Sequence, residues 1–144
     1  MDFALSPAEQ EIAALSRQLA AGVLAEQADA VDGGQFPLAG LRAVADAGLM
    51  GAKLPARFGG KDASNLAFCH VIHELAKVCA STAVTVSVTN MVADMIFKFG
   101  TPAQHERWLG PIARGGFPAA AMTRTSAQSA STTRTSMRIP ASMS

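Results

Sequence analysis

The stretch from Ser64 to Gly100 constrains the fold most, because apolar residues dominate it and recur at the spacing of α-helices. In its first half the polar side chains are confined to one narrow stripe, at positions i, i+3, i+4 and i+7. They are His70, His73, Glu74 and Lys77. The other faces, which are free to be buried, carry Leu66, Phe68, Val71, Ile72, Leu75 and Val78. A helix with so little polar surface needs neighbours on several sides, so this stretch predicts the centre of a helical domain.

The second half of this stretch is ambiguous between a strand and a helix. Residues 84–88 alternate between valine and small polar side chains, which is typical of a half-buried strand. Over a longer window the large apolar residues recur at helical spacing, at Val84, Val88, Met91, Val92, Met95 and Phe99. Asp94 also precedes Lys98 by four residues, the favourable order for an ion pair within a helix. We therefore predict a helix, in which buried hydroxyls can donate to carbonyls one turn earlier, so that Thr85, Ser87 and Thr89 need no partner in another strand.

Two capping boxes predict further helix starts. Ser6-Pro7-Ala8-Glu9 opens a helix that we expect to end near Ala30. Its amphipathic stripe consists of Ile12, Leu15, Leu19 and Val23. Thr101-Pro102-Ala103-Gln104 opens a short helix. That helix carries Trp108, Leu109 and Ile112.

The remaining segments complete an all-α prediction. Residues 36–47 are expected to form a helix with Leu38, Leu41 and Val44 inward and Gly48 as its C-terminal cap. Residues 49–60 form a connector, in which prolines and glycines mark turns. From residue 123 to 144 the chain is mostly Ser, Thr, Arg, Ala and Met without periodicity, so we predict a disordered tail. The predicted division is a helical domain over 1–117 and a separate C-terminal segment over 118–144.

Composition excludes several functional classes. The chain has 144 residues, of which 49% are hydrophobic, enough for the core of one domain. Its formal net charge is +1, from 12 basic and 11 acidic residues. So balanced a charge provides no strong field to steer nucleic acid and little attraction to an anionic membrane surface. We therefore expect no nucleic-acid partner.

The cysteines and the N-terminus predict a cytoplasmic protein. Cys69 and Cys79 are ten residues apart on one predicted helix, about 15 Å by helical rise, which is too far for a disulfide. Both are expected to be buried thiols in a reducing compartment. The N-terminal residues lack a basic region followed by an apolar one, and no later apolar run is expected to approach the ~20 residues of a membrane span.

Several short strings, in this order and spacing, resemble the N-terminal helical domain of the acyl-CoA dehydrogenase family. The strings are Phe3-Ala4-Leu5-Ser6, Asp46-Ala47-Gly48-Leu49-Met50-Gly51, Phe58-Gly59-Gly60, Glu74-Leu75-Ala76, Ala80-Ser81-Thr82-Ala83, Phe99-Gly100-Thr101-Pro102 with Gln104, Trp108-Leu109, and Pro111-Ile112-Ala113-Arg114-Gly115. The resemblance covers Met1 to about Thr123 and implies a bundle of about five helices. Members of the family are more than twice this length and continue with a β-barrel and a C-terminal four-helix domain. Residues from 118 would then be a remnant of the first barrel strand.

The resemblance implies α,β-dehydrogenation of an acyl-CoA, with FAD as the hydride acceptor. The family's glutamate base lies in the C-terminal domain, so we assign no catalytic residue in this chain. Glu74 is expected to be a solvent-facing partner of His70 and Lys77 instead. His70 and His73 share one helix face, but no third ligand converges on them in the sequence, and we predict no metal.

The resemblance also implies cofactor-binding and substrate-binding residues. Where the family has Thr-Glu-Pro-x-Ala-Gly-Ser-Asp, this chain has residues 123–130, and the matches are Thr123, Ala127 and Ser129. By resemblance, Met122 and Thr123 approach the flavin ring and Ser129 lies near the flavin and the thioester. Gln128 replaces a glycine that permits close backbone approach. Upstream, the acyl-chain side of the substrate pocket would be lined by Val88, Val92 and Met95, for which ordinary core packing is the alternative.

Two classes of function therefore remain open. The first is a fragment of a flavin-dependent acyl-CoA dehydrogenase that is not competent alone. The second is a non-catalytic helical module that pairs with another chain, as a homo-oligomer or with a partner subunit, through an exposed apolar face. A frameshift after Met122 would explain the altered motif: codons ACC CGA ACC encode Thr-Arg-Thr, whereas loss of one C restores Thr-Glu-Pro.

Overall fold

The computed structural model describes residues 4–116, and over this range the chain is helical with no strand. The elements are α1 (Pro7–Leu19), η1 (Ala20–Leu24), α2 (Ala25–Asp32), α3 (Leu38–Asp46), η2 (Ala56–Phe58), α4 (Asn65–Ala76), α5 (Ala80–Phe99) and α6 (Pro102–Ala113). α1, η1 and α2 follow one another without a loop and are bent by a kink at Gly22, so we count them together, and the described residues form five main helices. The all-α prediction is confirmed.

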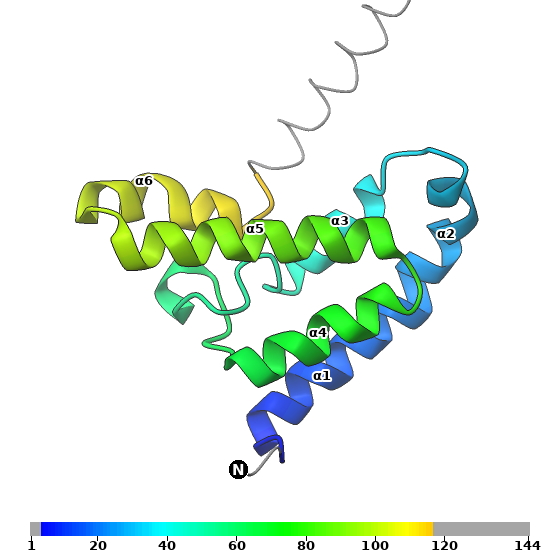
Figure 1. Cartoon of the computed structure of the whole chain (residues 1–144), viewed down its shortest axis with the longest axis horizontal. Coiled ribbons are helices and arrows are strands. Elements are labelled where there is room, and N and C mark those ends of the chain that lie inside the picture. The colour runs from blue at the N-terminus through cyan, green and yellow to red at the C-terminus, as the bar shows by residue number, and fades with distance from the viewer. Residues whose placement is uncertain (1–3, 117–144) are drawn as a thin grey trace, which may run out of the picture.

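The helices are arranged around α5, which crosses the front of the molecule in Figure 1. α1 and α4 lie side by side below it, and α6 follows α5 through a tight turn and packs against its C-terminal half. α3 contacts α5 from behind. α5 is therefore covered on one side only by the rest of the domain, whereas the sequence predicts a central helix pair with neighbours on several sides.

The predicted helix starts are confirmed by their hydrogen bonds. The Ser6 N–H donates to the Glu9 carboxylate at 2.9 Å, and the Glu9 N–H donates to the Ser6 hydroxyl at 3.4 Å. The same reciprocal pair joins Thr101 and Gln104, at 2.7 and 3.3 Å. Ser64 caps α4 by accepting from the Ala67 N–H at 3.2 Å. Each pair satisfies backbone donors that a helix N-terminus leaves free.

Two element boundaries differ from the prediction. The first helical segment ends at Asp32 rather than near Ala30, and it is kinked within the π-helical turn η1 at Gly22, whose φ of −97° and ψ of −109° are not helical. α3 begins at Leu38 rather than at residue 36, since a residue that precedes a proline is disfavoured in the α conformation. Leu38 lies in the first turn of α3 and is 38% exposed, so its inward placement was wrong.

The C-terminal cap of α3 is formed as predicted. Gly48 adopts φ +74°, a left-handed conformation that glycine accommodates without a steric cost. Its N–H donates to the Ala45 carbonyl at 2.8 Å, and the Leu49 N–H donates to the Val44 carbonyl at 3.0 Å. These two bonds are those of a Schellman motif.

α4 packs by a smaller buried face than the sequence suggests. Val71 and Leu75 are fully buried, whereas the other predicted residues are half-buried: Leu66, Phe68, Ile72 and Val78. Cys79 is buried but Cys69 is exposed, so the expectation of two buried thiols was wrong for Cys69. The reason is its position, because Cys69 and His73 lie one turn apart on the outward face of α4.

Candidate functional site

The helical prediction for residues 80–99 is confirmed, and the orientation of α5 is its unusual feature. The buried face consists of small or polar side chains: Thr82, Ala83, Thr85, Val86, Thr89, Asn90 and Ala93. The exposed face carries the large apolar residues, which are Val84, Val88, Met91, Val92, Met95 and Phe99. Below, this set is called the outer stripe. Apolar side chains in these numbers on one exposed helix face mark a surface that something else covers.

Hydrogen bonds within α5 explain why a locally strand-like sequence forms a helix. The Thr85 hydroxyl donates to the Ser81 carbonyl at 2.9 Å, and the Thr89 hydroxyl donates to the Thr85 carbonyl at 2.7 Å. Both buried hydroxyls are thereby satisfied inside the helix, as predicted. They need no partner in a neighbouring strand.

Two grooves adjoin the outer stripe, one at each end of α5. The groove between the C-terminal half of α5 and α6 measures about 460 Å³. It is lined by Val92, Met95, Ile96, Phe99, Gly100, Gln104, Trp108 and Ile112. A second groove of about 790 Å³ lies at the N-terminal end of α5 and includes Phe36, Pro37 and Val84. Because Val84 and Phe99 lie at opposite ends of the outer stripe, the stripe connects the two grooves.

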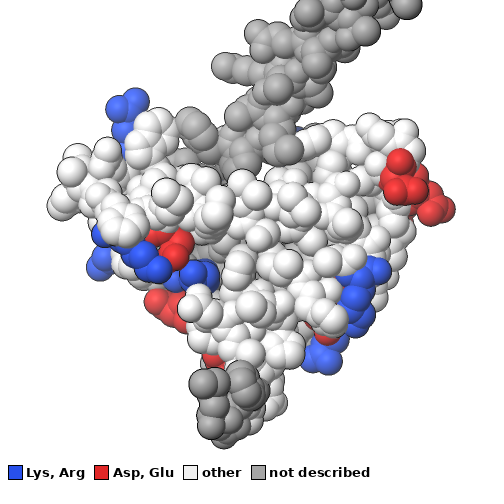
Figure 2. Space-filling view, viewed as in Figure 1, with Lys and Arg blue, Asp and Glu red and all other residues white. Residues whose placement is uncertain are grey.

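Charged side chains lie at the edges of this surface rather than on it. Figure 2 looks onto α5 and shows a largely uncharged expanse between peripheral acidic and basic groups. At one edge, the Asp94 carboxylate accepts from Lys53 at 3.0 Å and from Lys98 at 2.9 Å, which confirms the predicted Asp94–Lys98 pair. Partial burial raises the pKa of Asp94, but the hydrogen bonds from Lys98 and Lys53 outweigh it, and the pKa is lowered.

The structure rejects ordinary core packing for the three predicted substrate residues. Val88, Val92 and Met95 are 49%, 41% and 56% exposed. Val92 and Met95 line the groove beside α6, and Val88 lies one turn earlier on the same stripe. Their contact with a substrate stays a prediction. Sequence reasoning placed Trp108 and Ile112 on a short helix but did not assign them to a groove, since only the packing of α6 on α5 brings them there.

Comparison with known families decides the identity of the fold. The family described as acyl-CoA dehydrogenase, N-terminal domain, matches residues 6–116. This match covers more than half of the 144 residues. The chain belongs to this family.

Relatives of known name are longer than this chain. A probable acyl-CoA dehydrogenase of Bacillus subtilis is 28% identical over 117 residues, 80% of this chain and 31% of the relative. The 3-sulfinopropanoyl-CoA desulfinase of Paraburkholderia xenovorans is 35% identical over 130 residues, 89% of this chain and 34% of the relative. The structure of butyryl-CoA dehydrogenase from Megasphaera elsdenii matches with a TM-score of 0.71 at 29% identity, covering 80% of this chain and 31% of that one. The chain therefore spans about a third of the length of these relatives.

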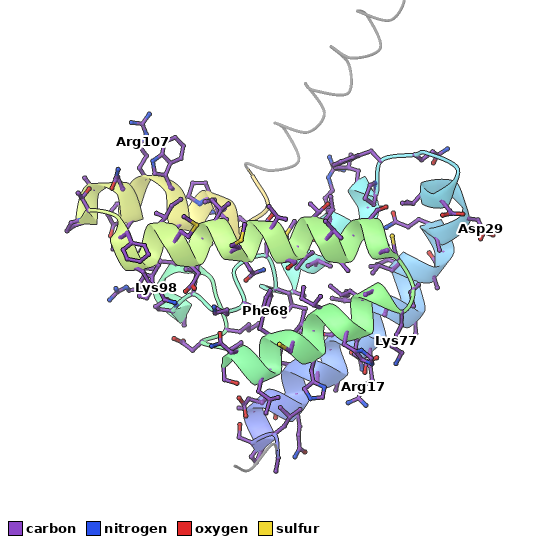
Figure 3. The ribbon with its side chains drawn as sticks, viewed as in Figure 1. Arg17, Asp29, Phe68, Lys77, Lys98 and Arg107 are labelled. Atoms are coloured by element: carbon purple, nitrogen blue, oxygen red, sulfur yellow. The ribbon has the colours of Figure 1, made fainter. Side chains whose placement is uncertain are left out.

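Glu74 is distant from the outer stripe and pairs locally on α4. Its carboxylate accepts from Lys77 at 2.8 Å, which confirms that predicted contact and lowers the pKa of Glu74. The further charges that lower this pKa are Arg17 and His73 rather than His70. Figure 3 shows Arg17 and Lys77 at the same end of the α1–α4 pair. Glu74 is half-buried, so the expectation of a solvent-facing side chain was wrong.

Within residues 4–116 no three metal-ligating side chains come together.

The groove beside α6 does not by itself fit a flavin dinucleotide. Two side chains in the lining of the groove beside α6 carry polar groups, Gln104 and Trp108, and the Gln104 side-chain oxygen already accepts from the Thr101 N–H. Among residues 4–116, no basic side chain lines this groove to meet a pyrophosphate. The predicted flavin residues Met122, Thr123 and Ser129 lie outside the described residues, as does the predicted disordered tail. The apolar lining fits an acyl chain better than a dinucleotide.

α5 also has the length and composition of a membrane-spanning helix. This corrects the expectation that no apolar run approaches that length. The core helix of a globular domain meets the same criterion, and the inner face of α5 is buried against α3 and α4. Packing within the domain therefore accounts for the inner face of α5, while the outer stripe stays exposed.

Proposed function

We propose that this chain supplies one wall of the acyl-CoA site of a flavin-dependent acyl-CoA dehydrogenase, which removes α and β hydrogens with FAD as hydride acceptor. The observation that carries the proposal is the outer stripe of α5, exposed beside an apolar groove of about 460 Å³. Apolar clefts of this size are typical of sites for small ligands. In this arrangement Val88, Val92 and Met95 contact the acyl chain.

The names of the relatives support an acyl-CoA substrate more broadly than they support dehydrogenation as the reaction. The relatives named above act on CoA thioesters by name, but one is a desulfinase and the others are dehydrogenases. A domain that contributes an apolar wall is compatible with either reaction, since the chemistry resides in the cofactor and in the base. The wall contributes orientation and exclusion of water.

A chimera tests the contact with the acyl chain. Residues 1–121 of this chain replace the corresponding domain of the Megasphaera elsdenii butyryl-CoA dehydrogenase, and turnover is measured on acyl-CoAs of increasing length. Met95→Phe narrows the groove and is expected to lower kcat/KM for longer chains by about tenfold relative to short ones. Met91→Phe is the matched control, because Met91 is equally exposed, at 56%, but does not line the groove. Equal effects of both substitutions would contradict the proposal.

The chain alone is proposed to be incompetent as a catalyst. By family resemblance the base lies in a C-terminal domain, and catalysis requires that base within hydrogen-bonding reach of the substrate. The purified chain mixed with FAD and desalted should be colourless and inactive in a dye-linked assay with acyl-CoAs. A yellow protein with one flavin per chain and measurable turnover would contradict the proposal that the chain alone is not a competent catalyst.

The altered motif at residues 123–130 supports a frameshift as its origin. The coding DNA tests this directly: bases downstream of the Met122 codon, read in the other frames, should encode a barrel and a C-terminal helical domain. Absence of both from those frames would rule the frameshift out.

We also propose that the chain is located in the cytoplasm. A fluorescent fusion would test this location.

A second candidate is a helical module that pairs with another chain through the outer stripe. The uncovered apolar face favours it, because soluble monomers rarely expose large contiguous apolar patches. Analytical ultracentrifugation of the purified chain separates the candidates. A stable dimer that Met91→Lys dissociates supports pairing, whereas a monomer supports the fragment.

A further inference from the structure

α5 places its large apolar residues outward, although burial of apolar area alone would favour the opposite rotation of the helix. Its small inner residues permit close packing but supply little apolar area. Something other than hydrophobic burial must therefore select this rotation. The candidates are the polar side chains of α5 that bond to other elements.

Asn90 and Asp94 make such bonds, one turn apart on α5. The Asn90 side-chain N–H₂ donates to the Leu49 carbonyl at 3.0 Å and to the Val86 carbonyl at 3.0 Å. The Asp94 carboxylate accepts from Lys53 at 3.0 Å. Leu49 and Lys53 are also four residues apart, in the connector that follows α3. The connector is thereby held at two points along one face of α5, and only this rotation of α5 makes both bonds.

Asn90 is the more specific of the two contacts. It is only 2% exposed, whereas the Lys53–Asp94 pair is partly solvated. The Asn90 side-chain oxygen is buried and has no hydrogen-bond partner within residues 4–116. Packing alone does not explain a buried amide whose oxygen has no hydrogen-bond partner, because a leucine of similar size would bury no polar atom at this position. Its bond to Leu49 is what the amide supplies and a leucine could not.

We propose that Asn90 is a positioning residue that fixes the rotation of α5 about its own axis and so presents the outer stripe to the ligand. The rotation itself follows from the contacts above, and its use for an acyl-CoA rests on the proposed function. Asn90 touches no ligand in this scheme. It acts through the Leu49 carbonyl.

Thiol labelling of the full chain measures the rotation. In a Cys69→Ser background, which removes the exposed native thiol, a reporter cysteine is placed either at Val88 on the outer stripe or at Val86 on the inner face. Mass spectrometry then gives the labelling rate of each site. We expect the Val88 reporter to react at least about 100-fold faster than the Val86 reporter, because a buried site reacts only through local opening. Adding Asn90→Leu should reduce this ratio by about tenfold or more.

Thr89→Val provides the matched control. Thr89 is also buried and adjacent to Asn90, but its hydroxyl bonds only to a carbonyl of its own helix, so the ratio should be unchanged. If circular dichroism shows that Asn90→Leu does not fold, Asn90→Ala carries the test, because alanine retains helix propensity. A folded Asn90 variant that keeps the parental ratio would overturn the proposal, even if its melting temperature falls. No flavin or thioester enters this assay, so its outcome is independent of the proposed function.

Discussion

α4 and α5 are neighbours in sequence and in space, yet they bury opposite kinds of side chain. α4 turns Val71 and Leu75 inward and exposes Cys69 and His73, as an amphipathic helix of a globular domain does. α5 turns threonine, alanine and asparagine inward and its valines, methionines and Phe99 outward. The difference indicates that α4 is built for the interior of this domain. α5 packs against the domain with one face and leaves its large apolar face exposed.

The first prediction tests whether α4 forms the core of the domain. Leu75 is fully buried, so Leu75→Ala should lower the free energy of unfolding by about 2–5 kcal/mol, through lost apolar contact and the cavity it leaves. Urea denaturation followed by circular dichroism measures this. A loss under about 1 kcal/mol would mean that α4 does not form the core.

The second prediction concerns the joint between α1 and α4. The Ser64 hydroxyl, which caps α4, donates to the Glu9 carboxylate that belongs to the capping box of α1. This bond, followed by those from Ser6, lowers the pKa of Glu9 below its ordinary value of 4.5. The stabilisation is therefore present above about pH 4.5 and is lost as the pH falls through the lowered pKa.

Glu9→Gln tests that joint. Its melting temperature should lie below that of the parent near neutral pH, and the gap should close as the pH falls below about 4. Glu11→Gln, on the same helix but outside the capping box, is the control and should show no such closing gap. A gap that persists in acid would mean that the Glu9 carboxylate contributes no charge-dependent stabilisation.

The third prediction tests whether the outer stripe of α5 contributes to the stability of the domain. Phe99 is 83% exposed, so Phe99→Ser should change the free energy of unfolding by less than about 0.5 kcal/mol despite removing a large aromatic side chain. The same denaturation experiment checks it. A cost close to that of Leu75→Ala would show that the outer stripe is buried within the domain.

The smallest expected effect is that of the C-terminal segment. Deleting every residue after Thr125 should leave the melting temperature unchanged, because the sequence there lacks an apolar periodicity with which to pack. Differential scanning calorimetry of the two chains is sufficient. A drop of several degrees would overturn the prediction of a disordered tail.

Sequence reasoning was most successful where the determinants are local. Capping residues and apolar periodicity predicted the starts of α1, α4 and α6 and the helical state of α5, because these depend on hydrogen bonds within a few residues. The rotation of α5 was not predictable in this way. It depends on the contact of Asn90 with Leu49, 41 residues away. The groove beside α6 was missed for the same reason, since Trp108 joins Met95 only through tertiary packing.

The central claim is that α5 exposes its large apolar face, and the native methionines test it without any substitution. Met91 and Met95 are each 56% exposed on the outer stripe, whereas Met50 is 1% exposed in the core. Dilute hydrogen peroxide oxidises accessible methionines, and mass spectrometry resolves the rate at each position. We predict that Met91 and Met95 of the purified chain are oxidised together and at least about tenfold faster than Met50. Protection of Met91 and Met95 to the level of Met50 would contradict the account.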